Sequence, residues 1–201
     1  MMKTTVGTAM VLGAALAMPA SGQELLTNPT FDGPPVGDGW GSFGAAGFHS
    51  FFGPNGHASL FADNAGNFGG VFQTGIAGSE GTEYLFELLD VRIESSFDAS
   101  LRFGLEYYDG ADSSKLGETI VSIDTSTTGD GLSFSMTGTA VPGTVFVRPI
   151  VLFDNVNPGY AGQGQANVFV FDSSLTVVPT PTALSALVVM AGLMLRRTRM
   201  A

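Results

Sequence analysis

The sequence predicts an all-β protein: one antiparallel β-sandwich of the jelly-roll type, flanked by an N-terminal signal helix and a short C-terminal transmembrane helix. Three observations support this prediction. Short runs rich in β-branched and aromatic residues recur through the middle of the chain, often with apolar and polar residues alternating. Turn-forming clusters separate the runs at intervals of about 8–12 residues, as in sandwiches and jelly rolls. No helical period extends beyond two turns between Gln23 and Val178.

Nine segments are predicted as strands. Glycine accounts for 28 of the 201 residues, and clusters such as ADNAGN and TTGDG supply the turns between strands. The predicted strands are 48–52, 58–62, 70–74, 83–93, 101–109, 119–124, 132–137, 144–153 and 167–178.

Two of these strands indicate how the sheet faces divide. In LRFGLEYYD, alternate apolar residues run from Leu101 to Tyr107, so that face packs, whereas the face that ends at Tyr108 meets water. TVFVRPIVLF is apolar on both faces except for Arg148, which predicts a strand near the middle of the sandwich. Pro149 cannot donate a ladder hydrogen bond, so it predicts an edge or a bulge at that point.

Composition restricts stability and partners. The chain has no cysteine, so the domain at 23–178 needs its apolar core, or a bound metal, for stability. This segment holds all 18 acidic residues but only four basic ones, which gives it a formal charge of −14. Such a surface repels phosphate backbones and excludes nucleic acid as a partner, whereas it suits calcium or basic partners. The four basic residues are Arg92, Arg102, Lys115 and Arg148.

Residues 1–22 have the order of a secretory signal peptide. Lys3 precedes an apolar stretch at 6–18, Pro19 interrupts it, and small residues follow before a predicted cleavage site ahead of Gln23. The alternative is a buried N-terminal helix. We predict that the mature chain is exported.

Residues 179–201 combine a proline spacer, the uncharged run 183–195 and a basic cluster. That run is shorter than the roughly 20 residues that cross a bilayer unaided. The segment resembles the PEP-CTERM sorting tail, with Thr180 in place of Glu, which implies cutting by an exosortase-type membrane protease. The alternative is an ordinary anchor in the inner membrane, with the basic end in the cytoplasm. The prolines and arginines of this tail are Pro179, Pro181, Arg196, Arg197 and Arg199.

The mature chain opens with ELLTNPTFDGPPVGDGW. This segment resembles the first strand of carbohydrate-binding modules and galactose-binding-like jelly rolls, which read Asn-Gly/Pro-x-Phe-Glu followed by Gly-Trp. Three later segments, GHASLFAD, GGVFQTGIAGSEGTEYLFELLDVRI and NVFVFDSSLTVV, resemble later strands of the same domains in the same order. The resemblance covers about residues 24–178 and concerns the fold more than the function, since one fold hosts many sites.

The resemblance implies a structural calcium ion between the first and last strands. Asp32 and Asp172 would supply the carboxylates, and backbone carbonyls the rest of the six to eight oxygens that Ca²⁺ takes. Asp32 stands where the family mostly has Glu, and Ser173 stands where a second Asp is frequent. The alternative is that Asp32 caps a turn and Asp172 is an edge residue.

Aromatic rings beside polar groups suit a sugar, which offers C–H faces and hydroxyls. The competing prediction for the single tryptophan is burial at one end of the sandwich, as a large ring with one polar tip permits. The candidates for carbohydrate binding are Trp40, Tyr108, Tyr160 and Asn155.

Motifs for catalysis are missing from the sequence. It has no Gly-x-Ser-x-Gly, no His-Glu-x-x-His and no phosphate-binding loop. We therefore predict a non-enzymatic cell-surface or extracellular-matrix protein that binds extracellular polysaccharide and passes through the inner membrane. The alternatives are an adhesive matrix protein without a sugar site and, less favoured, an envelope glycoside hydrolase that uses paired carboxylates.

Overall fold

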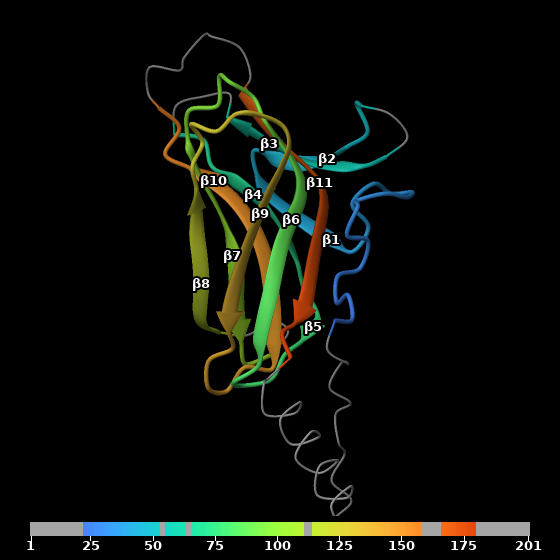
Figure 1. Ribbon diagram of the computed structural model, residues 1–201, viewed down its shortest axis with the longest axis vertical. Coiled ribbons are helices and arrows are strands. Elements are labelled where there is room, and N and C mark those ends of the chain that lie inside the picture. Colours follow the sequence, from blue (N-terminus) through green and yellow to red (C-terminus); the bar gives the residue numbers. More distant parts are fainter. Residues whose placement is uncertain (1–21, 53–54, 63–65, 111–113, 158–165, 180–201) are drawn as a thin grey trace, which may run out of the picture.

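Two antiparallel β-sheets pack face to face in the computed structural model of the chain (Figure 1), which describes residues 22–52, 55–62, 66–110, 114–157 and 166–179. The predicted all-β, two-sheet sandwich is confirmed. Within these ranges, no helix is both long and apolar enough to cross a bilayer. Nearly all of the predicted leader and of the predicted sorting tail lies outside the described residues.

The first sheet has six strands in the order β1–β4–β10–β7–β8, with β5 paired to the beginning of β10. Its strands are β1 (Trp40–Gly44), β4 (Gly69–Gln73), β5 (Ile76–Ala77), β7 (Ser100–Tyr108), β8 (Lys115–Ile123) and β10 (Phe146–Asp154). The second sheet has five strands in the order β2–β3–β11–β6–β9. Its strands are β2 (Ala46–His49), β3 (His57–Ala62), β6 (Glu83–Ile93), β9 (Gly129–Thr139) and β11 (Ala166–Val177).

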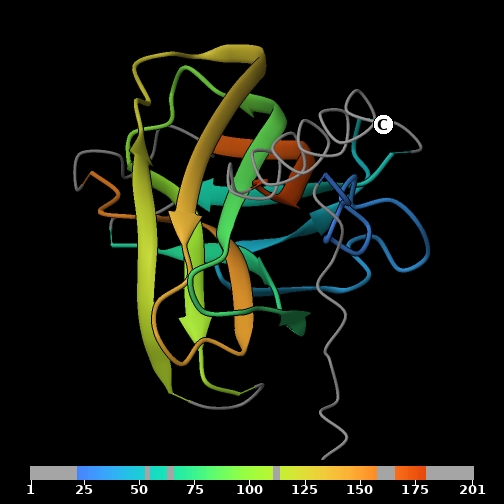
Figure 2. The same cartoon turned by 60° about the horizontal axis from the view of Figure 1, so that its bottom comes forward.

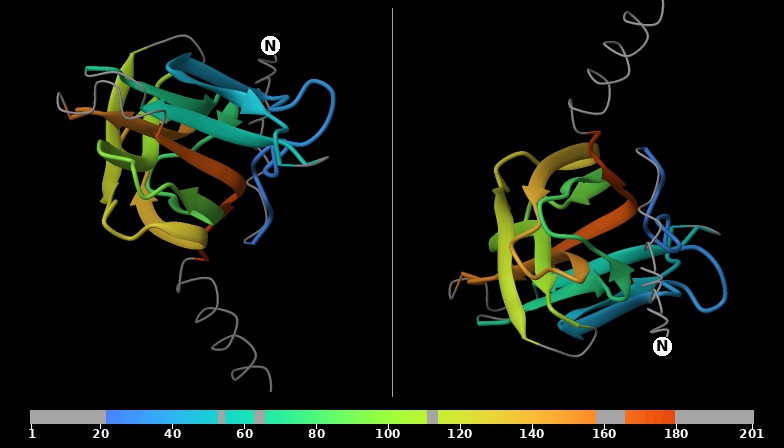
Figure 3. Two further views of the ribbon diagram at one scale, coloured as in Figure 1. Left: turned by 90° about the horizontal axis from the view of Figure 1, so that it is seen from above. Right: turned by 90° about the horizontal axis from the view of Figure 1, so that it is seen from below.

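The chain changes sheet repeatedly, so sequence neighbours often lie in opposite layers (Figures 2 and 3). From β3 onward, only the connections β4–β5 and β7–β8 stay within one sheet. The first described residues lie against the last strand, where Glu24 forms an isolated bridge with Thr176. Each layer therefore combines early and late segments, and neither sheet can form from one continuous stretch of chain.

Alternating side chains fill the space between the sheets. On β7, Leu101, Phe103, Leu105 and Tyr107 are all buried, as the alternation predicts. The Tyr107 hydroxyl lies 3.1 Å from the Thr119 hydroxyl, so the deepest polar group of this row is satisfied. Because the chain has no disulfide, this apolar interior is the main source of stability.

The strand predicted at 48–52 has the wrong bounds, because β2 ends at His49 and an unpredicted strand, β1, comes before it. β1 ends at Gly44, and β1 and β2 belong to different sheets. Gly44 has φ +61°, and a Cβ atom there would lie 2.1 Å from the carbonyl oxygen of Phe68. Only glycine fits this bend, which moves the chain from the edge of one sheet to the edge of the other.

The prediction of an edge or a bulge at Pro149 is also wrong. β10 is an interior strand, and Pro149 pairs in regular register with Leu105 of β7. On its other side β10 pairs with β5 through Val147 and with β4 from Ile150 onward. Pro149 lies between these two partners, at a point where no residue on that side needs a backbone N–H donor.

A cluster of aromatic rings lies outside the core, on the outer face of the five-stranded sheet around the β2–β3 connection. His57 is fully buried inside it, and neither of its ring nitrogens has a hydrogen-bond partner among the described residues. Burial, together with the charge of the nearby His49, lowers the pKa of His57 from 6.5 to about 4. The rings of this cluster belong to His49, Phe51, Phe52, His57, Phe61, Phe169 and Phe171.

The packing of Tyr107 against the opposite sheet is testable at Gly138. A Cβ atom at Gly138 would lie 2.5 Å from the Tyr107 hydroxyl oxygen. We expect Gly138→Ala to lower the free energy of unfolding by about 1–3 kcal/mol in urea denaturation, because the core is overpacked. Adding Tyr107→Phe removes the clashing atom, so the double variant should lose less stability than the sum of the single variants. Strict additivity would contradict this packing.

His57 predicts a pH dependence of stability. Its pKa is about 4 when folded and about 6.5 when unfolded, so protons favour the unfolded chain. The free energy of unfolding should therefore fall as the pH drops from 6.5 to 4, by up to about 3 kcal/mol, and this contribution should be constant below pH 4. His57→Leu should flatten this part of the stability curve. Parallel curves for the two proteins would show that His57 is not the group responsible.

Candidate functional site

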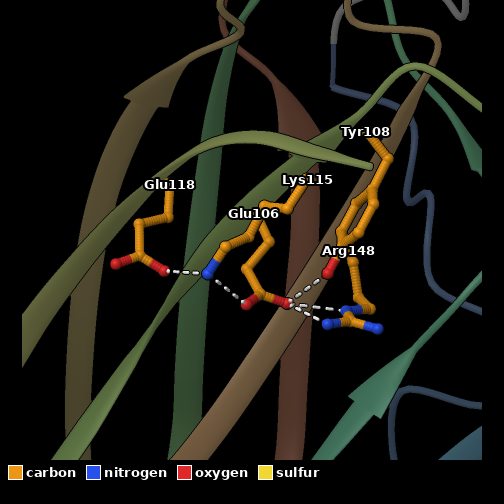
Figure 4. A network of polar contacts seen from close by, with 5 residues as sticks. All are labelled: Glu106, Tyr108, Lys115, Glu118 and Arg148. Carbon is orange, nitrogen blue, oxygen red and sulfur yellow. Dashed lines mark hydrogen bonds and ion pairs between the residues drawn. The ribbon is translucent and has the colours of Figure 1, made fainter. Parts of the chain in front are cut away.

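The outer face of the six-stranded sheet carries a compact polar network centred on Glu106 (Figure 4). Glu106 faces away from the core, yet its side chain is only 8% exposed. It accepts hydrogen bonds from Arg148 Nε at 2.6 Å, from the Tyr108 hydroxyl at 3.2 Å and from Lys115 Nζ at 3.3 Å. Lys115 also pairs with Glu118 at 2.7 Å. Two carboxylates and two cations make the network neutral overall.

Strand register brings these residues together. Arg148 of β10 lies directly opposite Glu106 of β7, and Glu106 lies opposite Glu118 of β8. A bulge after Tyr107 brings Lys115 opposite Tyr108. Three neighbouring strands therefore supply the network, and a shift of one residue in any pairing would turn its members to the other face.

Arg148 lies between two aromatic rings. Its guanidinium carbon is 4.6 Å from the centroid of the Tyr108 ring and 5.0 Å from that of Phe72 on β4. Cation–π contacts of this kind, combined with a charge pair to Glu106, hold a guanidinium in one place. The same contacts fix the positions of the two rings.

An aromatic row continues from Phe72 towards the edge of the sheet. Phe43 of β1 lies 6.2 Å from Phe72 between ring centroids, and Phe68 lies 6.4 Å from Phe43. Phe72 lies over Gly41, where a Cβ atom would be 2.7 Å from the ring. The missing side chain at Gly41 allows the Phe72 ring to lie close to the sheet. We call the rings Phe43, Phe68, Phe72 and Tyr108, together with the Glu106 network, the outer-face site.

The surroundings of Tyr108 and Lys115 raise the pKa of both side chains. Burial raises the pKa of Tyr108, and the negative charge of Glu106 raises it further. The hydrogen bond to Glu118 raises the pKa of Lys115. Tyr108 is therefore a neutral hydrogen-bond donor and Lys115 a cation at neutral pH.

The carbohydrate-binding residues predicted from the sequence do not form one group. Tyr108 belongs to the outer-face site. Asn155 lies at the opposite end of β10, where its amide donates to Ser100 and Asp154. Since Tyr108 pairs with Phe146 and Ser100 pairs with Asp154, about 27 Å of strand separates the two positions. Tyr160 lies outside the described residues.

The structure does not support Trp40 as a carbohydrate-binding residue. Its ring is buried, with 9% exposure, and packs 4.8 Å from Phe31 between centroids. Its Nε1 donates to the carbonyl oxygens of Thr27 and Asn28. The indole therefore fills one end of the core and exposes no ring face to a ligand. This agrees with the competing prediction for Trp40, burial at one end of the sandwich.

Hydrogen bonds within the protein engage Asp32 and the residue that follows Asp172. Asp32 accepts hydrogen bonds from Thr30 Oγ1 at 2.8 Å and from the Gly56 amide at 2.7 Å. The hydroxyl and amide of Ser173 both donate to the Pro29 carbonyl. No cluster of three or more metal-ligating side chains occurs in the described part of the chain. The hydrogen bonds support the alternative for Asp32, a turn cap, and calcium remains a prediction of the resemblance alone.

Asp172 nevertheless lies among other acids. Burial raises the pKa of its carboxyl, and the charges of Glu24, Asp90 and Asp32 raise it further. These residues come from the start of the chain, β6 and β11, which the sheet brings together. Asp32 and Asp172 are therefore close enough for their charges to interact, and a calcium ion between them stays a prediction.

Sequence analysis missed most of the outer-face site. Phe72 and Glu106 were not candidates, and Arg148 was noted only as an exception in an apolar strand. That exception was the available signal: one arginine on an otherwise apolar interior strand needs a buried acceptor. The identity of that acceptor depends on strand register, which the sequence leaves open.

No protein-family model and no curated protein matches this sequence. Solved structures do match its fold. The enzymatically active domain of bacteriophage CBA120 tailspike protein 4 has a TM-score of 0.56 and 8% identity, covering 77% of this chain and 21% of that one. An arabinose-bound α-L-arabinofuranosidase has a TM-score of 0.51 and 21% identity, with coverages of 77% and 26%. The chain thus spans about a quarter or less of these two proteins.

The carbohydrate-binding module TmCBM61, in complex with beta-1,4-galactotriose, has a TM-score of 0.47 and 15% identity, covering 77% of this chain and 99% of the module. At these identities the likenesses define a fold class, the two-sheet antiparallel sandwich, and no ligand.

The Arg148–Glu106 pair is testable by a conservative substitution. Lysine keeps the charge of Arg148 but loses the planar group that bonds Glu106 and lies between two rings. We expect Arg148→Lys to lower the free energy of unfolding by about 1–3 kcal/mol, because a buried carboxylate loses a donor. The control is Arg102→Lys, whose pair with Asp154 is about one-third exposed and should cost less than about 1 kcal/mol. Equal losses in urea denaturation would contradict the assigned role of Arg148.

Proposed function

We propose that this domain is an exported polysaccharide-binding module that contacts its ligand through the outer-face site. The observation that carries the proposal is the arrangement of Tyr108 and Phe72 on either side of a guanidinium locked to Glu106. Rings fixed in this way lose little conformational entropy when a sugar stacks on them.

The polar groups of the site suit a hydroxylated ligand. Lys115 and Arg148 remain partly exposed, at 42% and 28% of their side-chain surface, so a sugar hydroxyl can share their donors. Glu118, 46% exposed, offers a carboxylate acceptor at the same edge. Aromatic platforms combined with a few oriented polar groups are what carbohydrate recognition requires.

Two further lines support a carbohydrate ligand. The segments from ELLTNPTFDG to NVFVFDSSLTVV resemble strands of carbohydrate-binding modules in the right order. The arabinofuranosidase that shares this fold acts on sugars, by its name, and was solved with arabinose bound. We infer a jelly-roll module of the same kind, although a shared fold alone does not fix a ligand.

Export and sorting complete the proposal. The order of residues 1–22 supports secretion, and the Pro179–Arg199 tail supports sorting by an exosortase-type protease at the inner membrane. The domain would then work at the cell surface or in the extracellular matrix, where polysaccharides are abundant. Its charge of −14 suits a ligand without phosphate or sulfate groups.

Retention on insoluble polysaccharides tests the proposal. We expect wild-type protein to be retained on at least one of cellulose, xylan, arabinan and galactan, and Tyr108→Ala or Phe72→Ala to reduce retention at least fivefold. The control is Val145→Ala, which removes an apolar side chain that is 45% exposed outside the site.

Melting temperatures separate binding from folding in this experiment. Both aromatic variants should stay folded at the assay temperature, because their rings lie outside the core. Retention on none of the four materials, or equal retention of all variants, would instead favour an adhesive matrix protein without a sugar site here.

A further inference from the structure

A pocket of about 460 Å³ opens on the other sheet, between the end of β6 and the beginning of β9. The strands run so that this end of β6 lies at the upper end of the sandwich in Figure 1, whereas β7 ends at the lower end with Tyr108. The pocket and the Glu106 network are therefore on opposite sheets and at opposite ends. Its lining residues include Arg92, Glu94, Ser95, Ser96, Thr128 and Asp130.

Irregular strand pairing makes this pocket. Between the pairs Val91–Leu132 and Ile93–Gly129, β9 contains one residue more than β6. Another irregularity, in the opposite sense, lies between Leu88–Phe134 and Val91–Leu132. Bulges of this kind separate two strands locally and redirect side chains, and they are frequent beside binding sites.

An exposed aromatic ring lies beside the pocket, in contact with the lining residue Arg92. Phe52 is 51% exposed, and its ring packs at 4.9 Å from Phe169 and 5.8 Å from Phe171 between centroids. Arg92, which lines the pocket, has its guanidinium carbon 5.2 Å from the Phe52 ring and its Nε 3.2 Å from Asp130 Oδ1. Arg92 therefore joins the aromatic ring to the polar pocket in one continuous surface.

The polar groups of the pocket divide into occupied and free ones. Glu94 already accepts hydrogen bonds from the backbone amide and side-chain amide of Asn167, both at 3.0 Å. Asp130 is paired with Arg92. By contrast, Ser95, Ser96 and Thr128 are exposed, so their hydroxyls are accessible to a ligand. The pocket thus offers accessible hydroxyls and one compensated ion pair, with a flat apolar ring beside it.

We propose that this pocket is a second carbohydrate subsite, which takes a neutral sugar unit with Phe52 as its stacking platform. The ion pair between Arg92 and Asp130 presents both donors and acceptors to sugar hydroxyls, and the remaining lining is uncharged or already satisfied. An anionic sugar would meet Glu94 and Asp130 in a strongly acidic domain, which disfavours it. A cationic ligand would have to break the ion pair at Arg92.

Two sites on opposite sheets imply a function beyond retention on one chain. A single domain could bind two polysaccharide chains and hold them together. Such bivalence raises the apparent affinity for a dense matrix without any new contact. This subsite does not depend on the outer-face site, because the two share no residue.

Residue-resolved NMR titration tests the subsite. The ¹⁵N-labelled protein is titrated with cellohexaose, xylohexaose, arabinohexaose and galactohexaose, each separately. We expect at least one of these probes to shift the amide resonances of Ser95, Ser96 and Thr128, and Phe52→Ala to raise the Kd at these resonances at least fivefold. The matched control is Phe51→Ala, since Phe51 is more exposed, at 66%, but stacks on His49 at 4.5 Å and not on Arg92.

The outcomes separate the two sites. Shifts confined to Tyr108 and its neighbours would overturn the pocket and leave the outer-face proposal intact. Shifts confined to the pocket would support it and contradict the outer-face site. No shift with any of the four probes, or an equal loss of affinity in Phe51→Ala and Phe52→Ala, would overturn the subsite.

Discussion

A carboxylate buried on the outside of the sandwich is the interaction on which the proposed site depends. Glu106 points away from the core, yet its side chain is only 8% exposed. A buried charge is costly unless it is paired and hydrogen-bonded, so Glu106 requires Arg148, Tyr108 and Lys115 in their observed positions. The positions of the rings proposed to bind a sugar therefore depend on the pairing of one buried carboxylate, Glu106.

This constraint explains why an interior strand carries arginine. β10 is covered by neighbours on both edges, and an apolar residue at 148 would suit its outer face equally well in isolation. With Glu106 directly opposite on β7, only a cation can neutralise the acid. A planar guanidinium can also lie between Phe72 and Tyr108, which an ammonium group does less well.

The sequence predicted much of the sandwich, because alternation and turns are local signals. The strand at 83–93 has the predicted bounds, and Tyr107 lies in the core as its place in the alternation required. The bend at Gly44 was missed, since its cause is a contact with Phe68, 24 residues away. Of the outer-face site only Tyr108 was predicted, because its partners come from strands whose register no local pattern specifies. Trp40 was a candidate for carbohydrate binding because it is a tryptophan. Its burial depends on contacts with Phe31 and with the Thr27 and Asn28 carbonyls, which no local pattern specifies.

A double-mutant cycle on Glu106 and Arg148 tests the central claim most directly. The free energies of unfolding of wild type, Glu106→Gln, Arg148→Met and the double variant are measured in urea. If the pair organises the outer face, the coupling energy between the two positions should be at least about 1.5 kcal/mol. Single-variant losses that add within about 0.5 kcal/mol would contradict the account, since the two side chains would then act independently.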